Sequence, residues 1–335
     1  MDNFITIILF IVGLILLIKG GDWFVDGATG IASRFHVPDI LIGATVVSIG
    51  TTLPEVMVSA TSAATGHGEI AYGNAIGSII CNTALIAALT ISIRPSKVDK
   101  STMKLPVIFF FIASAYYIGV AYLKKDFSRL DGIILLTLFA TYMTMAVIQA
   151  LKDQELHQIL SKGADVHELQ EEQLETVFNP LWKDLVLLAV GAALIAVGAD
   201  LLVDKGTLIA RMLGVPESVI ALTFVALGTS LPEFVTAITS LVKGHGALSV
   251  GNIIGANMFN LVFVSGIAIT IRPFNLPAEK MLAGMPASLV VDVPLMLIVM
   301  YIMTVPALKC GKLFRAQGFL LLAIYSAFCV YQFVG

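Results

Sequence analysis

The stretch Gly-Thr-Thr-Leu-Pro-Glu at residues 50–55 returns as Gly-Thr-Ser-Leu-Pro-Glu at residues 228–233, which lie 178 positions further along the chain. The same ungapped shift aligns the Gly-His-Gly triplet at residues 66–68 with that at residues 244–246. Across residues 20–95, 31 of 76 positions are identical to their counterparts 178 residues later. Shared apolar composition does not produce such agreement without gaps. The chain therefore contains an internal duplication, and its two copies decide the fold.

The composition places this duplication in a lipid bilayer. Of the 335 residues, 58% are hydrophobic and only 13% are charged, and the mean hydropathy is +0.93. A soluble domain carries roughly 25% charged residues, so a soluble protein is excluded. The chain has 20 Lys and Arg against 23 Asp and Glu, which leaves no basic footprint for nucleic acid. The sequence therefore predicts an integral membrane protein with no nucleic-acid partner.

Ten apolar segments are long enough to cross a bilayer as helices, which takes about 20 residues each. They span residues 4–26, 39–64, 69–92, 104–123, 130–151, 184–205, 216–242, 247–271, 281–304 and 315–334. We expect an all-α protein with a first five-helix repeat at residues 1–151, an acidic cytoplasmic linker at residues 152–183 and a second repeat at residues 184–335. Because five is odd, the second repeat enters the membrane upside down. Inverted repeats of this kind are typical of secondary transporters.

The basic residues predict the orientation of these spans. With the N-terminus outside, 13 of the 20 Lys and Arg residues fall in loops on the cytoplasmic side and 7 in loops on the other side. Basic residues are enriched in cytoplasmic loops. We therefore expect a multi-pass protein of the cell inner (plasma) membrane with both termini outside.

Glu55 and Glu233 occupy matched positions in the middle of apolar spans. A charge at the centre of a membrane helix costs about 2.5–3.5 kcal/mol, so a compensating partner is expected. Neither span contains Lys, Arg or His. The partner is then a bound cation or a proton. The alternative is a structural pair of carboxylic acids that donate hydrogen bonds to neighbouring hydroxyls.

Pro54 and Pro232 precede these carboxylates and predict a break in each helix. Proline has no N–H, so Pro54 is expected to free the carbonyl of Gly50, and Pro232 that of Gly228. The carbonyl end of a half-helix carries negative partial charge. Freed carbonyls beside a carboxylate favour a cation site at each break.

Hydroxyl and amide side chains recur every three or four residues around the two carboxylates, which places them on shared helix faces. They are Ser48, Thr52, Ser59, Ser62, Asn74, Ser78 and Asn82 in the first copy and Ser230, Ser240, Asn252 and Asn260 in the second. Oxygen ligands without His or Cys suit hard cations. Calcium takes six to eight oxygens and two carboxylates neutralise its charge, whereas magnesium fits less well. Sodium can share the same oxygens.

Two further features carry weaker predictions. His67 and His245 lie in Gly-His-Gly triplets and are expected to form tight turns rather than proton sensors. Asp292 lies inside the ninth apolar span, before Pro294. It is either a secondary proton or cation site or a structural acid near a helix break.

The doubled motif at residues 50–55 and 228–233, with Gly-Asn-x-x-Gly following each copy, closely resembles the paired alpha-repeats of the sodium/calcium exchanger family, within the cation/calcium antiporter superfamily. The resemblance covers nearly the whole chain, and the short linker is similar to that of prokaryotic members. It implies ten spans in inverted halves, with one Ca²⁺ or several Na⁺ held alternately at mid-membrane. It also implies that the first and sixth spans act as sliding gates.

The resemblance implies a role for each matching residue. Glu55 and Glu233 are the shared central carboxylates, Thr52, Ser78 and Ser230 supply hydroxyls, and Thr51, Thr229 and Ala226 supply backbone carbonyls. Asn82 and Asn260 stand where some members have aspartate. Potassium-dependent members have an acid at the second of these positions, so Asn260 favours independence of potassium. Ala256 stands where a serine is frequent, which weakens one sodium ligand.

The leading functional hypothesis is therefore Na⁺/Ca²⁺ antiport by alternating access, with Ca²⁺ and Na⁺ as transported ions and no cofactor. A H⁺/Ca²⁺ exchanger is the alternative, because protons could displace the cation from buried carboxylates. A cation channel is a third hypothesis from another class, although channels usually assemble symmetric pores or open filters. An enzyme is not expected, because the spans hold no nucleophile–base pair. The oligomeric state stays open, with a monomer as the default.

Overall fold

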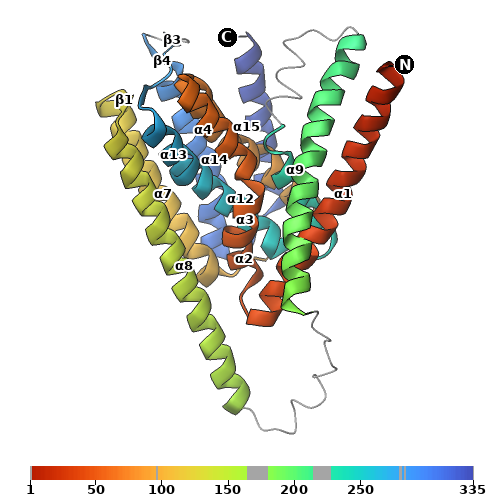
Figure 1. Ribbon diagram of the computed structural model, residues 1–335. Helices are drawn as coiled ribbons and strands as arrows, with labels where there is room; N and C mark the ends of the chain where they lie inside the picture. The colour runs from red at the N-terminus through yellow and green to blue at the C-terminus, as the bar shows by residue number, and fades with distance from the viewer. Residues whose placement is uncertain are drawn as a thin grey trace.

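Long apolar helices form most of the molecule (Figure 1), for which a computed structural model describes residues 2–95, 97–163, 180–213, 228–278, 281–282 and 284–334. Within these residues, seven helices are long and apolar enough to cross a membrane, and a bent helix pair makes an eighth. The seven stretches are Phe4–Phe35, Gly68–Ile93, Lys100–Leu123, Arg129–Lys152, Leu181–Ile209, Gly246–Ile271 and Ser288–Cys310. The prediction of a helical membrane protein is confirmed.

Five long helices run without a π-helical turn. They are α1 (Asp2–Phe35), α7 (Lys100–Leu123), α8 (Arg129–Gly163), α9 (Leu181–Met212) and α15 (Arg315–Val334). The α15 helix has 20 residues, which matches the predicted tenth span. The N- and C-terminal ends of the chain lie at the same end of the bundle (Figure 1).

The spans that follow the doubled motif are built from α-helix interrupted by a π-helical turn. In the first copy α5 (Gly68–Cys81) continues through η2 (Asn82–Ala87) into α6 (Ala88–Ile93). In the second copy α12 (Gly246–Met258) continues through η4 (Phe259–Val264) into α13 (Ser265–Ile271). π-Helical turns are rare and frequently mark functional sites. Their presence at matched positions of the two copies is not visible in the spacing of apolar residues.

The second predicted span is bent where the proline motif lies. It consists of α2 (Asp39–Ile42), η1 (Gly43–Val47) and α3 (Ser48–Thr51), followed by α4 (Leu53–Thr65) after a bend of 48°. Its counterpart in the second copy is the short helix α11 (Leu231–Val242). Residues 216–227 of the predicted span 216–242 lie outside the described part of the chain, and so does half of the predicted linker, residues 164–179.

One predicted boundary, the start of the ninth span, is wrong. The ninth span begins at Ser288 and not at residue 281, because β3 (Met281–Leu282) and β4 (Met285–Pro286) form a hairpin ahead of η5 (Ser288–Asp292) and α14 (Val293–Cys310). Helix α8 continues past its apolar stretch, Arg129–Lys152, to Gly163, and α9 begins at Leu181, just ahead of the predicted sixth span. A second pairing joins β1 (Asp126–Phe127) to β2 (Phe274–Asn275) and links the loops of the two copies.

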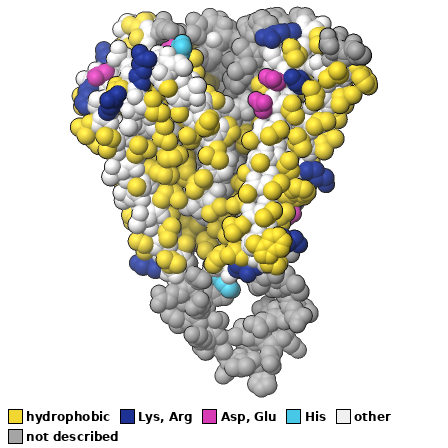
Figure 2. Space-filling view, in the orientation of Figure 1, with side chains coloured by type: hydrophobic (Ala, Val, Ile, Leu, Met, Phe, Trp, Pro, Cys, Tyr) yellow, Lys and Arg dark blue, Asp and Glu magenta, His cyan; other side chains and the backbone are white. Residues whose placement is uncertain are grey.

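The surface and the interior agree with a membrane setting. Hydrophobic side chains cover the middle of the molecule, and most charged side chains gather toward its two ends (Figure 2). The main buried cluster draws its members mostly from α5 to α8 and α12 to α15. A second cluster joins α1 and α9 to the first half of the bent span, with Phe24, Val47 and Ile195 among its buried members. Helices α1 and α9 therefore form a packing unit beside the main core.

Candidate cation-binding site

The two proline motifs produce the same local geometry. The helix breaks at Thr52, with φ −86° and ψ 0°, and the second copy has nearly identical torsions at Ser230, with φ −89° and ψ 5°. Pro54 and Pro232 each occupy the second position of the following helix. Proline is favoured there because the first N–H groups of a helix have no partner within it. The duplicated sequence thus builds two equivalent helix starts.

Each break places a carboxylate in the first turn of a helix. Glu55 is the third residue of α4 and Glu233 the third of α11, and both side chains are 0% exposed. The N-terminus of a helix carries positive partial charge, which stabilises a nearby carboxylate. The two carboxylates are also close enough to repel each other electrostatically. Repulsion between buried charges of like sign is relieved when a cation binds between them.

A hydrogen bond across the duplication joins the two motifs. The Thr52 hydroxyl donates to Glu233 Oε1 at 3.3 Å, so a residue of the first copy contacts the carboxylate of the second. The amide of Asn74 donates to the Glu55 backbone carbonyl at 3.1 Å and to the Ser59 hydroxyl at 2.8 Å. Residues of the first copy therefore contact both the Glu233 side chain and the Glu55 backbone.

Asn252 ties the first half of the bent span to α12. Its side-chain oxygen accepts a hydrogen bond from Thr51 at 3.3 Å, and its backbone carbonyl accepts one from Ser48 at 3.1 Å. Ser48 is 0% and Thr51 is 2% exposed. The side chain of Thr51 is therefore held by a residue 201 positions away in the sequence.

Many buried polar atoms around the two carboxylates have no hydrogen-bond partner among the described residues. They are both carboxylate oxygens of Glu55, Oε2 of Glu233, the Ser230 and Thr236 hydroxyls, and the side-chain amides of Asn82 and Asn260. Unpaired buried polar groups are costly, and they are rare in folded proteins unless water or an ion satisfies them. Their chemistry is carboxylate, hydroxyl and amide oxygen, which fits Ca²⁺ or Na⁺. The described residues contain no cluster of three His, Cys, Asp or Glu, so a softer metal finds no equivalent site there.

The predicted site residues fall into three groups. Nine of them are buried: Glu55, Glu233, Thr51, Thr52, Ser78, Asn82, Ser230, Asn260 and Pro232. Four are half-buried: Gly50, Pro54, Gly228 and Thr229. Asn82 opens η2, and Asn260 is the second residue of η4. Both asparagines therefore lie in the π-helical turns. Ala226 lies outside the described residues.

One predicted carbonyl is not free. The Gly228 carbonyl accepts a hydrogen bond from the Leu231 N–H at 3.3 Å, so the prediction that Pro232 leaves it without a partner is wrong. In a continuous helix the Gly228 carbonyl would accept from the N–H of residue 232, which proline lacks. A tight turn at residues 228–230 instead brings the Leu231 N–H within reach of this carbonyl. The Thr52 carbonyl, at the first break, accepts from the Val56 N–H at 3.1 Å.

Asp292 lies at the start of its span. Because the helix begins at Ser288, Asp292 is the last residue of η5 and lies one turn into the span. It interacts electrostatically with Tyr72, whose hydroxyl donates to the Ser288 carbonyl at 3.4 Å. The structure thus places Asp292 near the hairpin end of the helix and does not bring it into the pair formed by Glu55 and Glu233.

The Gly-His-Gly triplets form tight turns, as predicted. Gly66 and Gly244 adopt left-handed conformations, with φ values of +92° and +88°, and the histidines that follow are the N-caps of α5 and α12. His245 Nδ1 lies 3.0 Å from Asp39 Oδ2, a contact that links α12 to α2.

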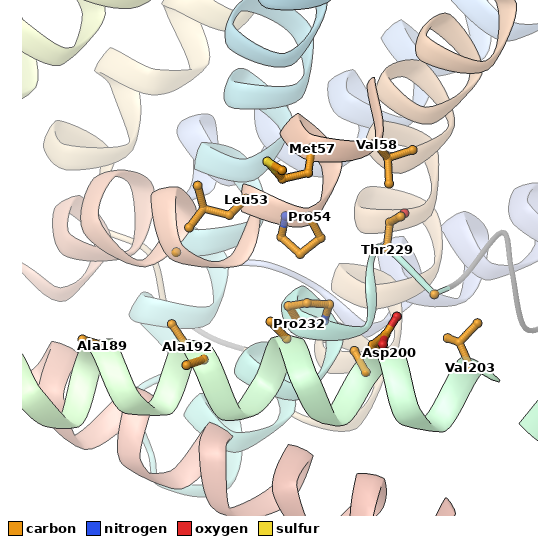
Figure 3. A pocket seen from close by; sticks show the side chains of 15 residues that line it. Leu53, Pro54, Met57, Val58, Ala189, Ala192, Asp200, Val203, Thr229 and Pro232 are labelled. Carbon is orange, nitrogen blue, oxygen red and sulfur yellow. The ribbon is translucent and has the colours of Figure 1, made fainter. Parts of the chain in front are cut away.

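A cavity of about 750 Å³ lies beside the two helix breaks, between the bent span and α9. Pro54 and Pro232 lie on facing sides of it, and Asp200 projects toward it from α9 (Figure 3). Gly50, Thr229 and several alanines of α9 complete this part of its wall. The two helix breaks and α9 therefore border the same cavity.

Two further buried polar residues, Thr236 and Asn257, were not among the predicted site residues. Thr236 follows Glu233 by one turn and is 0% exposed. The Asn257 amide donates to the Thr83 hydroxyl at 2.6 Å and bridges the two copies. Both are polar residues inside apolar spans, a pattern that is visible in the sequence. Neither has a polar counterpart 178 positions earlier, where Val58 and Ile79 stand, so the repeat did not point to them.

Substituting Asn252 with Ala is expected to lower the free energy of unfolding by about 1–3 kcal/mol, because Thr51 loses its side-chain acceptor inside the protein. Thermal unfolding of the purified protein measures this. Thr137→Ala is the matched control, since the Thr137 hydroxyl is exposed and bonds only to its own helix at Ile133. Equal stability of the two variants would contradict the role given to Asn252.

A buried pair of carboxylates at two duplicated helix breaks, surrounded by hydroxyl and amide oxygens, is a candidate cation-binding site in a helical membrane protein. A family model described as sodium/calcium exchanger protein matches residues 5–148 and 183–334. The chain belongs to the sodium/calcium exchanger family, and it is accordingly a transporter and not an enzyme.

Individual relatives agree with this assignment. The chain is 35% identical to an uncharacterized membrane protein of Methanocaldococcus jannaschii, over 94% of each chain. It is 28% identical to the sodium/calcium exchanger MaX1 of Methanosarcina acetivorans, over 99% of this chain and 98% of that protein. A solved structure of the sodium-calcium exchanger NCX_Mj superposes with a TM-score of 0.75 at 34% identity and covers 97% of this chain and 98% of its own.

Proposed function

We propose that the protein is a sodium/calcium antiporter that works by alternating access, in which Ca²⁺ and Na⁺ compete for Glu55 and Glu233. The observation that carries this proposal is the pair of fully buried carboxylates, because three of their four oxygens accept no hydrogen bond from the described residues. The relatives named as sodium/calcium exchangers support the choice of the two ions.

The proposed ligands surround the two carboxylates. Thr52, Ser78 and Ser230 supply hydroxyl oxygens, Asn82 and Asn260 supply amide oxygens, and Thr51, Thr229 and Ala226 supply backbone carbonyls. Burial of the Ser230 hydroxyl and the two amides without partners supports this assignment. Asp292 is a structural acid in this proposal, because it belongs to the neighbourhood of Tyr72.

The same carboxylates couple the two ion fluxes. With neither ion bound, the site holds two negative charges in a medium of low dielectric, and moving such a site across the membrane is costly. Ca²⁺ or several Na⁺ neutralise the pair. Only a site that holds ions then switches its exposure from one side of the membrane to the other. Each Ca²⁺ that moves one way is therefore exchanged for Na⁺ that moves the other way.

Helices α1 and α9 are the proposed gates. They pack against each other in a cluster beside the main core, which permits them to move as a unit. At one end of the molecule α1 is attached to the loop after α11, since Lys243 Nζ lies 2.7 Å from Asp26 Oδ1 and 3.6 Å from Asp22 Oδ1. The position of α9 that matches Asp22 is Asp200, which instead lines the large cavity. The two proposed gates are therefore in different surroundings at these matched positions.

The finer architecture follows the duplication. We propose ten spans in two inverted repeats, residues 1–151 and 184–335, joined by a cytoplasmic linker at residues 152–183. Both termini then lie outside the plasma membrane, in agreement with the common end they share in Figure 1. The excess of basic residues in the loops assigned to the other end supports its cytoplasmic placement.

An outward sodium gradient in proteoliposomes is expected to drive calcium uptake, and potassium added to either side is expected to leave the rate unchanged. The second expectation rests on Asn260, which offers potassium no carboxylate. Isotopic calcium flux measures both, with sodium, potassium and pH varied independently.

Each alternative gives a different result in that experiment. Calcium uptake that ignores sodium and collapses with a protonophore would replace the proposal with H⁺/Ca²⁺ exchange. A steady calcium current with no counter-ion would indicate a channel. Stimulation by potassium would overturn the argument from Asn260.

A further inference from the structure

A second, smaller cavity lies away from the cation site, where the loop between α6 and α7 meets the turn between α11 and α12. It has a volume of about 340 Å³. Arg94 and Lys97 line it from the loop, and Gly244, Gly246 and Ala247 line it from the turn and the start of α12. Two cationic side chains and a helix N-terminus therefore face one space.

The N-terminus of α12 has no side-chain cap. Its N-cap residue, His245, makes no capping hydrogen bond and its ring is engaged with Asp39 instead. The His245 carbonyl accepts from the Ser249 N–H at 3.2 Å, so the N–H groups of Gly246 and Ala247 precede the first bond of the helix. The helix continues through η4 and α13 for 26 residues. Such an N-terminus carries positive partial charge and favours an anion.

Arg94 and Lys97 have no hydrogen-bond or ion-pair partner for their side chains within the described residues. The neighbouring cations are engaged: Lys243 pairs with Asp22 and Asp26, and Arg315 donates to the Ile93 carbonyl at 3.3 Å. The carboxylate in the same loop, Asp99, accepts from the Ser101 N–H at 3.0 Å and caps α7. Arg94 and Lys97 are both exposed, and neither side chain is paired with a carboxylate of the described residues.

The depth of the cavity matches that of lipid headgroups. Arg94 directly follows the apolar stretch Gly68–Ile93, and Gly246 begins the apolar stretch Gly246–Ile271. Both boundaries mark the level at which a span leaves the hydrocarbon. Leu241 and Pro95 add apolar wall beside the charged residues. Basic pockets between transmembrane helices at this level bind anionic headgroups.

We infer that this cavity is a binding site for the phosphate group of an anionic membrane lipid, held by Arg94, Lys97 and the N–H groups at the start of α12. A free phosphate ion offers the same chemistry, so the test must separate the two sources. The site is distinct from Glu55 and Glu233, and its existence does not depend on which ions are transported.

Lipid binding to the full-length protein tests the inference by native mass spectrometry, with phosphatidylglycerol as the anionic probe and phosphatidylcholine as the neutral one. The double variant Arg94→Gln/Lys97→Gln is expected to bind phosphatidylglycerol about tenfold more weakly or worse, because it loses charge-assisted hydrogen bonds to the phosphate. The control Lys104→Gln/Lys152→Gln removes the same charge from exposed positions that do not line the cavity, and it is expected to bind like the original protein. Binding of phosphatidylcholine is expected to be the same in all three proteins.

Competition by inorganic phosphate decides between the two sources. If millimolar phosphate leaves phosphatidylglycerol binding unchanged, the site takes the lipid. If phosphate displaces the lipid, and binds the control better than Arg94→Gln/Lys97→Gln, the same residues hold a soluble anion. The inference is overturned if the two double variants bind both probes equally. Retained calcium uptake in each variant verifies that the protein is folded.

Discussion

Replacing Glu55 with Gln is expected to reduce sodium-driven calcium uptake at least about a hundredfold, and Glu233→Gln is expected to do the same. Glutamine keeps the size and the hydrogen-bonding oxygen of the side chain but removes its charge. The attraction between a divalent cation and one buried carboxylate amounts to several kcal/mol even at an effective dielectric constant of about 20. Either substitution therefore removes most of the preference for Ca²⁺, and uptake into proteoliposomes measures the loss.

The control for both variants is Glu69→Gln, which makes the same chemical change at an exposed carboxylate in the first turn of α5. Its transport is expected to match that of the unmodified protein. Size-exclusion profiles and thermal unfolding establish that all three variants are folded. Transport near the normal rate in Glu55→Gln or Glu233→Gln would contradict the assignment of the site.

Substituting Gly251 with Val is expected to destabilise the protein by about 3 kcal/mol or more and to abolish transport with it. A Cβ atom at this position would meet the backbone of Ile40, coming within 2.9 Å of its carbonyl carbon and overlapping its carbonyl oxygen. Backbone atoms of a packed helix have little freedom to move aside. Helices α2 and α12 would have to separate, and the contacts of Asn252 with Ser48 and Thr51 would be lost with them.

The matched control is Gly119→Ala, in the interior of α7, where no heavy atom of the described residues lies within 4 Å of an added Cβ. Because alanine favours a helix more than glycine does, this variant is expected to be as stable as the original protein or slightly more stable. Thermal unfolding compares the variants. A Gly251→Val protein that unfolds at the same temperature as the control would disprove the close packing of α2 against α12.

The membrane class, the duplication and the two carboxylates could be predicted from the sequence, because each depends on a local pattern or on the similarity of the two copies. The aligned motifs at residues 50–55 and 228–233 predicted equivalent helix breaks, and the torsions of Thr52 and Ser230 agree with that prediction. Glycines four apart let helices approach closely, and Gly251 and Gly255 lie in this way against α2 and η1. Gly73 and Gly77 have no such neighbour among the described residues.

The remaining features arise from contacts that no single segment specifies. The contact of Asn252 with Thr51 joins residues 201 positions apart, and the turn that occupies the Gly228 carbonyl depends on the exact path of the break. The hairpin at residues 281–286 contains apolar Met and Leu. Its hydropathy therefore resembles that of a membrane helix, and the predicted ninth span included it. The π-helical turns at Asn82 and Asn260 leave no signature in an apolar pattern of helical period.

Equilibrium binding of isotopic calcium to the purified protein tests the central claim most directly. We predict saturable binding of one Ca²⁺ per chain, displacement of that Ca²⁺ by Na⁺, and loss of the binding in both Glu55→Gln and Glu233→Gln but not in Glu69→Gln. Calcium binding that persists in both glutamine variants, or that sodium leaves unchanged, would contradict a shared site at the two helix breaks.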